Sequence, residues 1–512
     1  MLVKLFGAAV QGIDATLITI EVNCSRGIRF MLVGLPDTSV KESHERIVSA
    51  IEVNGLKFPR QQIVINMSPA DIRKEGSAYD LPLAVGILAA SGAVSSSVLG
   101  DFLMMGELSL DGTILPLKGA LPIALMAKKN GFKGFILPIA NAREAAVVDG
   151  LEVYGVNNIS EVVAFFNGKQ KLQPTKVDLQ REFREGRAAF EFDFSEVKGQ
   201  ENVKRALEVA AAGGHNVIMI GPPGSGKSMM AKRMPSILPP FSLEEALETT
   251  KIHSVAGKTD LCRSIMTSRP FRSPHHTISD VAMVGGGSYP QPGEISLAHN
   301  GVLFLDELPE FSRNVLEVMR QPLEDRRITI SRAKFSVDYP AGFMMVAAMN
   351  PCPCGYHNHP TKECVCPPGA VQKYLNRISG PLLDRIDIQI EIVPVPFEKI
   401  SDVKSAEQSA DICKRVVKAR ERQLHRFRGR EGIFCNAQMS GRMLHEYASP
   451  DPTGLNLLRA AMERLNLSAR AYDRILKVSR TIADLDGSDQ VKPLHLAEAI
   501  NYRNLDRENW AL

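Results

Sequence analysis

Eight residues near the middle of the chain have the types and spacing of a phosphate-binding loop. They match the pattern GxxxxGK[ST] and are Gly221, Pro222, Pro223, Gly224, Ser225, Gly226, Lys227 and Ser228. Glycines let backbone N–H groups reach phosphate oxygens, the lysine offers a charge to the β- and γ-phosphates, and the serine hydroxyl can ligate Mg²⁺. An apolar run precedes the loop and a helical pattern follows it. This context predicts a site for ATP and Mg²⁺ rather than a chance glycine-rich turn.

Polar side chains that could complete this chemistry end two later apolar runs. Residues 302–305 lead into Asp306 and Glu307, and residues 343–349 lead into Asn350. We expect Asp306 to hold Mg²⁺, directly or through water, and Glu307 to polarise the attacking water. The Asn350 amide can hold that water against the γ-phosphate. Such short unalternating runs are typical of parallel strands buried on both faces, whose carboxyl ends bind ligands.

Four of the eight cysteines lie within 15 residues, and they are Cys352, Cys354, Cys364 and Cys366. Four thiolates suit a tetrahedral structural Zn²⁺ site. The C-x-C spacing departs from the commoner C-x-x-C, and His357 and His359 are competing ligands. The alternatives are cysteines buried as small apolar groups and a redox or regulatory role.

The composition excludes several classes of protein. The 512 residues carry 61 Lys and Arg against 57 Asp and Glu, a net charge of +4, so nucleic-acid binding would have to rest on local basic patches. The 44% of hydrophobic residues exclude global disorder. No secretory signal is visible, and the longest uncharged run, residues 81–100, holds four serines and three glycines. That run predicts a buried helix plus loop, and the chain is expected to be cytoplasmic with no membrane contact.

The elements needed to position these residues predict three domains. Residues 1–168 mix short apolar runs with helical patterns, residues 169–191 are polar and charged like a linker, and residues 192–395 hold the phosphate loop and the cysteine-rich loop 352–366. Residues 396–512 have helical patterns throughout. Within that region, residues 414–430 carry eight Lys and Arg and one Glu. This run is either a solvated helix face or a strip that meets DNA or a neighbouring subunit.

Several strings in one order resemble the ComM/YifB family of magnesium-chelatase-like AAA+ ATPases. They are residues 33–37 (VGLPD), 74–82 (KEGSAYDLP), 272–276 (RSPHH), 292–299 (PGEISLAH), 350–355 (NPCPCG) and 383–387 (LDRID). The resemblance covers essentially the whole chain. It implies an α/β fold class: a P-loop AAA+ core, an N-terminal α+β domain like that of Lon protease (ribosomal S5 domain 2-like), and a C-terminal all-α lid.

The resemblance also implies roles for individual residues. Arg385 matches the arginine finger that reaches into a neighbouring subunit's ATP site, and Arg470 matches the second sensor in the lid. A finger acting in trans implies a ring, here a nucleotide-dependent homo-hexamer. A hairpin before Asn350, with residues 331–334 at its turn, matches hairpins that line the pore of related rings. Arg332 and Lys334 there would contact single-stranded or branched DNA through phosphates.

The N-terminal domain resembles the Lon proteolytic domain without its base. Ser77 falls where the Lon nucleophile sits, but the position of the general-base lysine is Leu121. A serine needs an adjacent base to become nucleophilic, so a non-catalytic domain is expected, in which Ser77 could cap a helix.

The leading hypothesis is therefore an ATP-driven DNA helicase or branch-migration translocase, in recombination or natural transformation (competence). A chelatase-type motor that remodels a protein partner is the alternative. A protease is disfavoured by Leu121.

Overall fold

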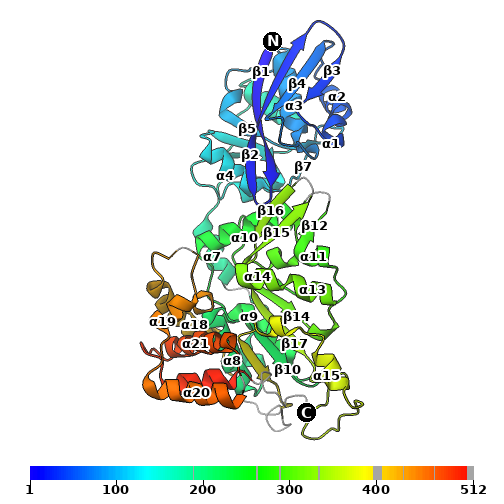
Figure 1. Cartoon of the computed structure of the whole chain (residues 1–512). Helices are drawn as coiled ribbons and strands as arrows, with labels where there is room; N and C mark the ends of the chain where they lie inside the picture. The colour runs from blue at the N-terminus through cyan, green and yellow to red at the C-terminus, as the bar shows by residue number, and fades with distance from the viewer. Residues whose placement is uncertain are drawn as a thin grey trace. The chain divides into compact units, whose positions relative to one another are not determined.

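The computed structural model describes residues 1–187, 190–260, 263–287, 290–332, 335–395, 406–430, 432–465 and 467–503. They form two compact units (Figure 1). The first comprises Met1–Gly186 and Leu243–Thr267, and the second holds the remaining described residues. The first unit thus takes in a segment that lies, in sequence, inside the predicted ATPase core. Among the described residues, no helix has the length and apolarity needed to cross a membrane.

A seven-stranded mixed sheet organises the first unit, in the order β3-β4-β2-β1-β5-β8-β9. β1, β2 and β4 are antiparallel neighbours, and the other pairs are parallel. Its strands are β1 (Leu2–Gln11), β2 (Asp14–Ser25), β3 (Phe30–Val33), β4 (Gln62–Ser68), β5 (Phe102–Met104), β8 (Gly134–Pro138) and β9 (Glu152–Val156). β6 (Glu107–Leu108) and β7 (Ile114–Leu115) form a separate hairpin.

The helices of the first unit include α7 and α10, whose place in this unit the sequence does not predict. They are α1 (Thr38–Lys41), α2 (Ser43–Val53), α3 (Asp80–Ala90), α4 (Ala120–Lys129), α5 (Ile139–Ala145), α6 (Ile159–Phe166), α7 (Leu179–Arg187) and α10 (Leu243–Ala256). α3 packs on β1 and β2 with all its residues buried, so the uncharged run 81–100 supplies a core helix, as expected. α7 lies in the stretch predicted to be a linker. Its Glu182 binds the Ser264 hydroxyl at 2.6 Å and Arg143 at 2.7 Å.

A five-stranded parallel sheet organises the second unit, in the order β11-β14-β17-β10-β18. The strands are β11 (Phe271–Arg272), β14 (Val302–Leu305), β17 (Met344–Met349), β10 (Val217–Ile220) and β18 (Ile388–Glu391). The helices around it are α8 (Glu201–Gly213), α9 (Lys227–Ile237), α11 (Asp280–Val284), α12 (Glu294–Leu297), α13 (Arg313–Val318), α14 (Arg320–Asp325), α15 (Ala370–Leu375) and α16 (Gly380–Leu383). β10, β14 and β17 are buried throughout, which explains their unalternating apolar sequences.

The second unit also contains two small hairpins, each a separate two-stranded sheet. β12 (Gly285–Gly286) pairs with β13 (Gln291–Pro292), and β15 (Arg327–Arg332) pairs with β16 (Phe335–Pro340). The second is the hairpin predicted before Asn350, and β15 extends through Ser331 and Arg332, which the sequence pattern places at the turn. Lys334 and the side chain of Arg332 lie outside what the structure describes.

The C-terminal region is helical, drawn in orange and red in Figure 1. It contains α18 (Ser409–Arg426), α19 (Gly441–Tyr447), α20 (Pro452–Leu465), α21 (Ala469–Leu485) and α22 (Pro493–Asn501). Its apolar residues join those of α8, α9 and the sheet in one core. The predicted fold class is confirmed: an α+β first unit, a parallel sheet with a phosphate loop, and an all-α C-terminal part.

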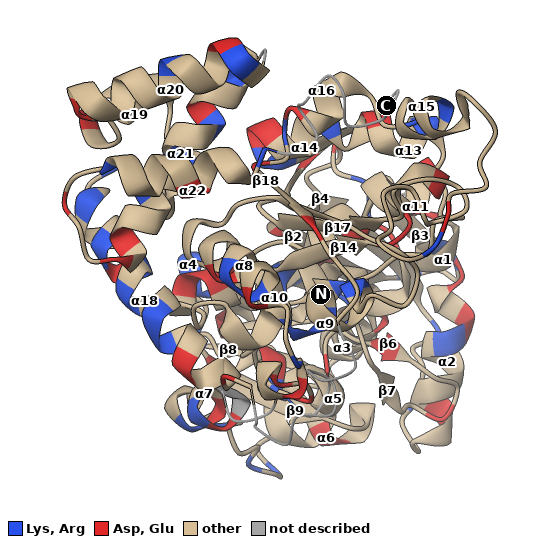
Figure 2. Cartoon of the chain, turned by 90° about the horizontal axis from the view of Figure 1, so that it is seen from below, with Lys and Arg blue, Asp and Glu red and all other residues tan. Residues whose placement is uncertain are grey.

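Most cations of the basic run 414–430 are already paired within the chain. Figure 2 shows them as blue bands along α18. Arg415 pairs with Glu208 and Glu407, and Arg430 pairs with Glu446 at 3.0 Å. Arg420 donates to the last carbonyl groups of α8, which have no partner inside that helix. The run therefore serves mainly to fix α18 against its neighbours.

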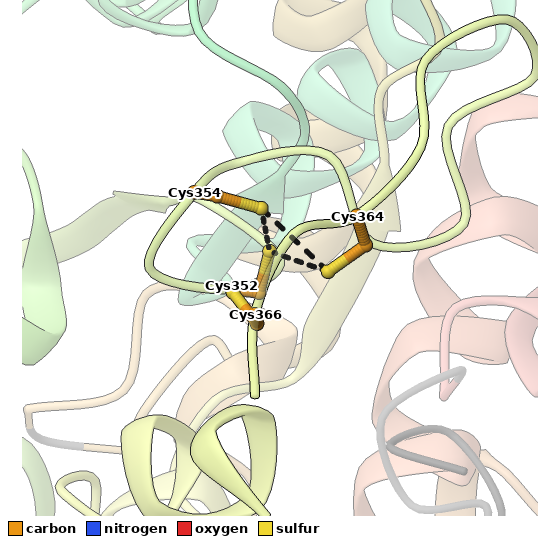
Figure 3. Close-up of side chains that lie close together, drawn as sticks. All are labelled: Cys352, Cys354, Cys364 and Cys366. Atoms are coloured by element: carbon orange, nitrogen blue, oxygen red, sulfur yellow. Dashed lines mark hydrogen bonds between the residues drawn. The ribbon is translucent and has the colours of Figure 1, made fainter. Parts of the chain in front are cut away.

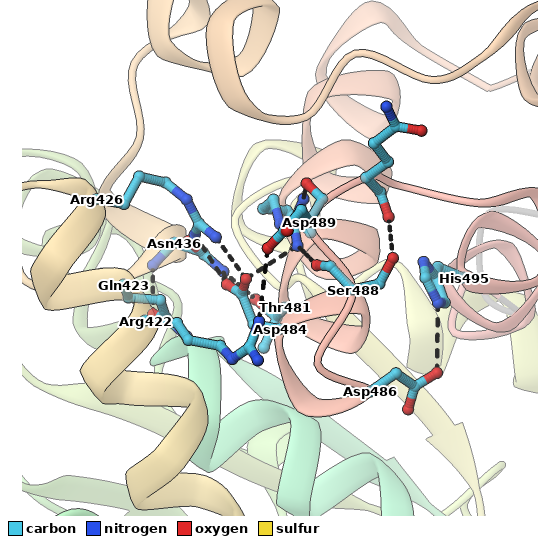
Figure 4. Close-up of polar contacts among 12 residues, drawn as sticks. Arg422, Gln423, Arg426, Asn436, Thr481, Asp484, Asp486, Ser488, Asp489 and His495 are labelled. Carbon is cyan, nitrogen blue, oxygen red and sulfur yellow. Dashed lines mark hydrogen bonds and ion pairs between the residues drawn. The ribbon is translucent and has the colours of Figure 1, made fainter.

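Asp484 of α21 lies at the centre of the polar network in Figure 4. Its side chain is fully buried. It binds both terminal nitrogens of Arg426 at 2.8 and 2.5 Å, Nη2 of Arg480 at 3.0 Å and Nδ2 of Asn436 at 2.8 Å. Because one carboxylate balances two largely buried guanidinium groups, this network holds α18 and α21 together.

Candidate functional site

The phosphate loop joins the central strand β10 to helix α9. The loop takes left-handed backbone conformations at Gly224 (φ 76°) and Gly226 (φ 89°), which side chains disfavour. At Gly221 an added Cβ would lie 2.6 Å from the Ile392 carbonyl oxygen beyond β18. The glycines of the motif therefore follow from backbone geometry as well as from the need to approach phosphates.

Lys227 folds back over this loop. Its Nζ donates to the carbonyl oxygens of Gly221 at 2.7 Å and Pro222 at 2.9 Å, and it lies 3.2 Å from Oδ1 of Asn350. Burial lowers the pKa of Lys227, and the negative charges of Asp306 and Glu307 oppose that shift. The ammonium group is thus held at the mouth of the loop, where phosphate oxygens can replace its carbonyl partners.

Ser228 and Asp306 meet as a candidate Mg²⁺ ligand pair. The Ser228 hydroxyl donates to Oδ2 of Asp306 at 2.6 Å. Mg²⁺ prefers oxygen ligands and is commonly held by one or two side-chain oxygens together with substrate phosphates. These two side chains therefore fit the ion that the motif implies.

Glu307 follows Asp306 at the carboxyl end of β14 in a left-handed conformation (φ 53°), with a carboxylate that is 55% exposed. Its Oε2 lies 3.4 Å from Nδ1 of His276, whose ring contacts that of His275 in a tilted arrangement with centroids 4.1 Å apart. His276 lies in the string RSPHH at residues 272–276, and no role for it is predicted from the sequence. Its position just after β11, the strand next to β14, could have shown that it reaches Glu307.

The two arginines expected to act on nucleotide lie on another part of the second unit. Arg385 is 7% exposed, donates to the Pro381 carbonyl oxygen and pairs with Glu324 at 2.5 Å. Arg470, on α21, is 63% exposed and pairs with Asp384 at 3.3 Å. Arg470 therefore binds Asp384, the residue directly before Arg385. Within the described part of the chain, the ion-pair partner of Arg385 is Glu324 and that of Arg470 is Asp384.

The four clustered cysteines converge (Figure 3). The sulfur of Cys352 lies 3.3 Å from that of Cys354 and 3.7 Å from that of Cys364, and all four sulfurs lie within 4.8 Å of one another. A tetrahedral Zn²⁺ with Zn–S bonds of about 2.3 Å spaces its sulfurs about 3.8 Å apart. Among the described residues this is the cluster with metal-ligand geometry.

The crowded thiols have widely separated pKa values. Burial opposes ionisation of Cys354, but hydrogen bonds from the Tyr356 backbone and the Cys352 thiol outweigh it and lower the pKa of Cys354 to about 6. Burial raises the pKa of Cys366 to about 12. Four thiolates cannot share so small a volume without a compensating cation, so the donor set fits a divalent metal.

In the first unit, the residue at the position of the general-base lysine of Lon proteases is part of the hydrophobic core. Leu121 lies in α4, is fully buried, and its backbone N–H donates to Glu144 at 3.0 Å. Ser77 begins a short 3₁₀ turn, Ser77–Tyr79, and α3 begins only at Asp80 with Tyr79 at its N-cap. The expectation that Ser77 caps this helix is therefore wrong.

Comparison with known proteins decides the family. Three family patterns cover successive parts of the chain: magnesium chelatase, subunit ChlI, at residues 193–400; subunit ChlI of Mg-chelatase at 20–141; and the ChlI C-terminal region at 406–503. YifB of Salmonella typhimurium is 44% identical over 502 residues, covering 98% of this chain and 96% of that protein. Competence protein ComM of Haemophilus influenzae is 42% identical over 510 residues, covering 98% and 97%. The chain belongs to the ComM/YifB family.

The geometry of the phosphate loop and its neighbouring strand ends agrees with this family, whose members are AAA+ ATPases of the magnesium-chelatase type. A further similarity is confined to part of the chain. Lon protease 2 of Bacillus subtilis is 32% identical over 145 residues, which cover 28% of this chain and 26% of that protease. The predicted Lon-like character of the N-terminal part is thus supported by sequence as well as by its α+β architecture.

Proposed function

We propose that the chain is an ATP-driven ring motor that acts on DNA as a helicase or branch-migration translocase. The observation that carries the ATPase part of the proposal is the convergence of Lys227, Ser228, Asp306 and Asn350 from three neighbouring strand ends onto one phosphate loop. The name of the relative ComM associates that protein with competence, and this supports a role in recombination during DNA uptake.

Each residue of the site has a separate role in the proposed ATP hydrolysis. The loop backbone and Lys227 bind the phosphates, and Ser228 with Asp306 would hold Mg²⁺, which supplies neutralisation of phosphate charge when bound. Glu307 accepts a proton from the attacking water, and Asn350, next to Lys227, orients that water. Arg385 of a neighbouring subunit completes the site in a ring, here a hexamer, with Arg470 as second sensor.

A closed ring requires Arg385 to leave its partner. In the single chain, Arg385 pairs with Glu324, so the finger must exchange that carboxylate for the charge of a neighbour's nucleotide. Arg470 and Arg474 of α21 bind Asp384 and Asp387 on either side of it, at 3.3 and 2.9 Å. Movement of the lid helix would therefore move the finger segment directly.

The proposal predicts an ATPase that DNA stimulates. ATP turnover should rise several-fold with at least one of single-stranded, duplex or four-way branched DNA, because a translocating motor couples hydrolysis to its track. The measurement is steady-state phosphate release against each DNA at fixed low salt, with Lys227→Ala as the inactive control. Equal rates with all three DNAs and with none would contradict a DNA motor while leaving an ATPase in place.

A chelatase-type motor that remodels a protein partner is the second candidate, because the matched family is described as magnesium chelatase subunit ChlI. Porphyrin metallation by this chain together with candidate partners would favour it. DNA-dependent turnover without metallation would favour the DNA motor.

We also propose that the cysteine cluster holds one structural Zn²⁺. Purified protein should contain about one zinc per chain, and Cys354→Ser should lose most of it, because four-cysteine sites need every thiolate. Metal content by mass spectrometry is the measurement. Cys24→Ser, which changes a buried cysteine of β2 in the other unit, is the matched control and should retain the metal. Zinc-free wild-type protein from a zinc-replete preparation would contradict the assignment.

A further inference from the structure

The cysteine loop begins next to Asn350, and the helix that follows the loop returns to that residue. Cys352, two residues after Asn350, is fully buried. After the last cysteine the chain enters α15, whose Tyr374 is buried and interacts with the backbone of Asn350. The sulfur cluster therefore closes a loop whose two ends meet at a residue of the ATP site.

The same loop also lies against the phosphate loop. Gly355 has a left-handed backbone (φ 83°), and its N–H donates to the Cys352 carbonyl oxygen at 3.0 Å. A Cβ added to Gly355 would lie 2.5 Å from Cδ and 2.8 Å from Cγ of Pro223. The ring of Pro223 is bonded to the backbone of the phosphate loop and can change only its pucker, so a side chain at residue 355 has to shift the phosphate loop and the cysteine loop against each other.

We propose that the cysteine loop is a brace for the phosphate loop, with Gly355 as the positioning residue. The sulfur cluster fixes the turn at 352–355, the bare backbone of Gly355 packs closely against Pro223, and this contact keeps the loop in its phosphate-binding conformation. Gly355 acts through Pro223 and touches no nucleotide. The inference rests on the proposed function only in taking ATP as the ligand of the loop.

A matched pair of glycine variants tests the contact. Gly355→Ala should raise the Kd for a fluorescent Mg·ATP analogue by about tenfold or more, because overpacking a rigid contact must shift the loop. Gly369→Ala lies in the same segment with nearly the same backbone strain (φ 77°), but its added Cβ has nothing within 4 Å. It should leave the Kd within about twofold. Zinc content and Tm, measured on both variants, report whether the cluster and the fold survive.

A double-variant cycle separates this role from a general loss of structure. Pro223→Ala removes the Cγ and Cδ atoms that the new Cβ would meet, so Gly355→Ala should weaken binding much less in the Pro223→Ala background than in the wild type. Effects that simply add, or equal Kd values for Gly355→Ala and Gly369→Ala, would overturn the brace. Wild-type protein that does not bind the analogue would instead overturn the proposed ATPase.

Discussion

Glu307→Gln is expected to lower kcat for ATP hydrolysis by about 10²–10⁴-fold, because the amide cannot accept the proton of the attacking water. Nucleotide binding should persist, since the phosphate loop, Lys227 and the Ser228–Asp306 pair are unchanged. The variant should therefore accumulate as an ATP-bound ring. Single-turnover phosphate release, equilibrium binding of an ATP analogue, and mass by light scattering with and without ATP measure the three effects.

Glu310→Gln is the matched control for Glu307→Gln. Glu310 ends the 3₁₀ turn Leu308–Glu310, and its half-exposed carboxylate pairs with Arg377 at 2.8 Å. Loss of such an exposed pair costs about 0–1 kcal/mol and should leave kcat close to the wild-type value. If both variants hydrolyse ATP at the wild-type rate, Glu307 is not the base. If both lose activity, the turn after β14 matters more than the carboxylate.

Asp484→Ala is expected to destabilise the second unit by about 3–5 kcal/mol, because it leaves the guanidinium groups of Arg426 and Arg480 buried without their counter-charge. Both lie within 3.0 Å of that carboxylate. The loss should appear as a lower urea midpoint of the transition that reports on this unit and as faster amide hydrogen exchange in α18 and α21.

Asp486→Ala provides the comparison two residues away. The Asp486 carboxylate is 43% exposed and pairs with His495 at 3.3 Å and with Arg205 at 3.6 Å, so the loss of these exposed pairs should cost about 0–1 kcal/mol. Similar losses for the two variants would show that the burial of Asp484 adds nothing to its stabilising effect.

The local parts of the ATP site could be predicted from the sequence because each is a short run with its own geometry. A strand, a glycine loop and a helix start follow directly in the chain at residues 217–227. Asp306 could be placed beside Ser228, and Asn350 beside Lys227, because the carboxyl ends of parallel strands share one edge.

Contacts between distant segments could not be predicted in the same way. The pairing of Arg385 with Glu324 depends on where α14 packs, and the contact of Gly355 with Pro223 depends on the path of a loop without regular structure. Helix α7 could not be predicted because its polar residues have the composition of a linker, although its Glu182 accepts a hydrogen bond from the Ser264 hydroxyl. A polar composition indicates that a helix has a solvent-exposed face, but it does not show which single side chain binds a distant residue.

The segment Leu243–Thr267 changes how the chain can be divided and how it must fold. The backbone leaves the second unit after Ser242 and returns at Ser268, having placed α10 against α4, with the Gly119 N–H bonded to the Ser254 carbonyl oxygen at 3.1 Å. The first unit is therefore discontinuous and cannot be complete on a ribosome until residue 267 has been synthesised. A fragment cut at the linker would leave α10 without the surface that covers it, so isolated domains should be made by splicing residues 243–267 onto the N-terminal piece.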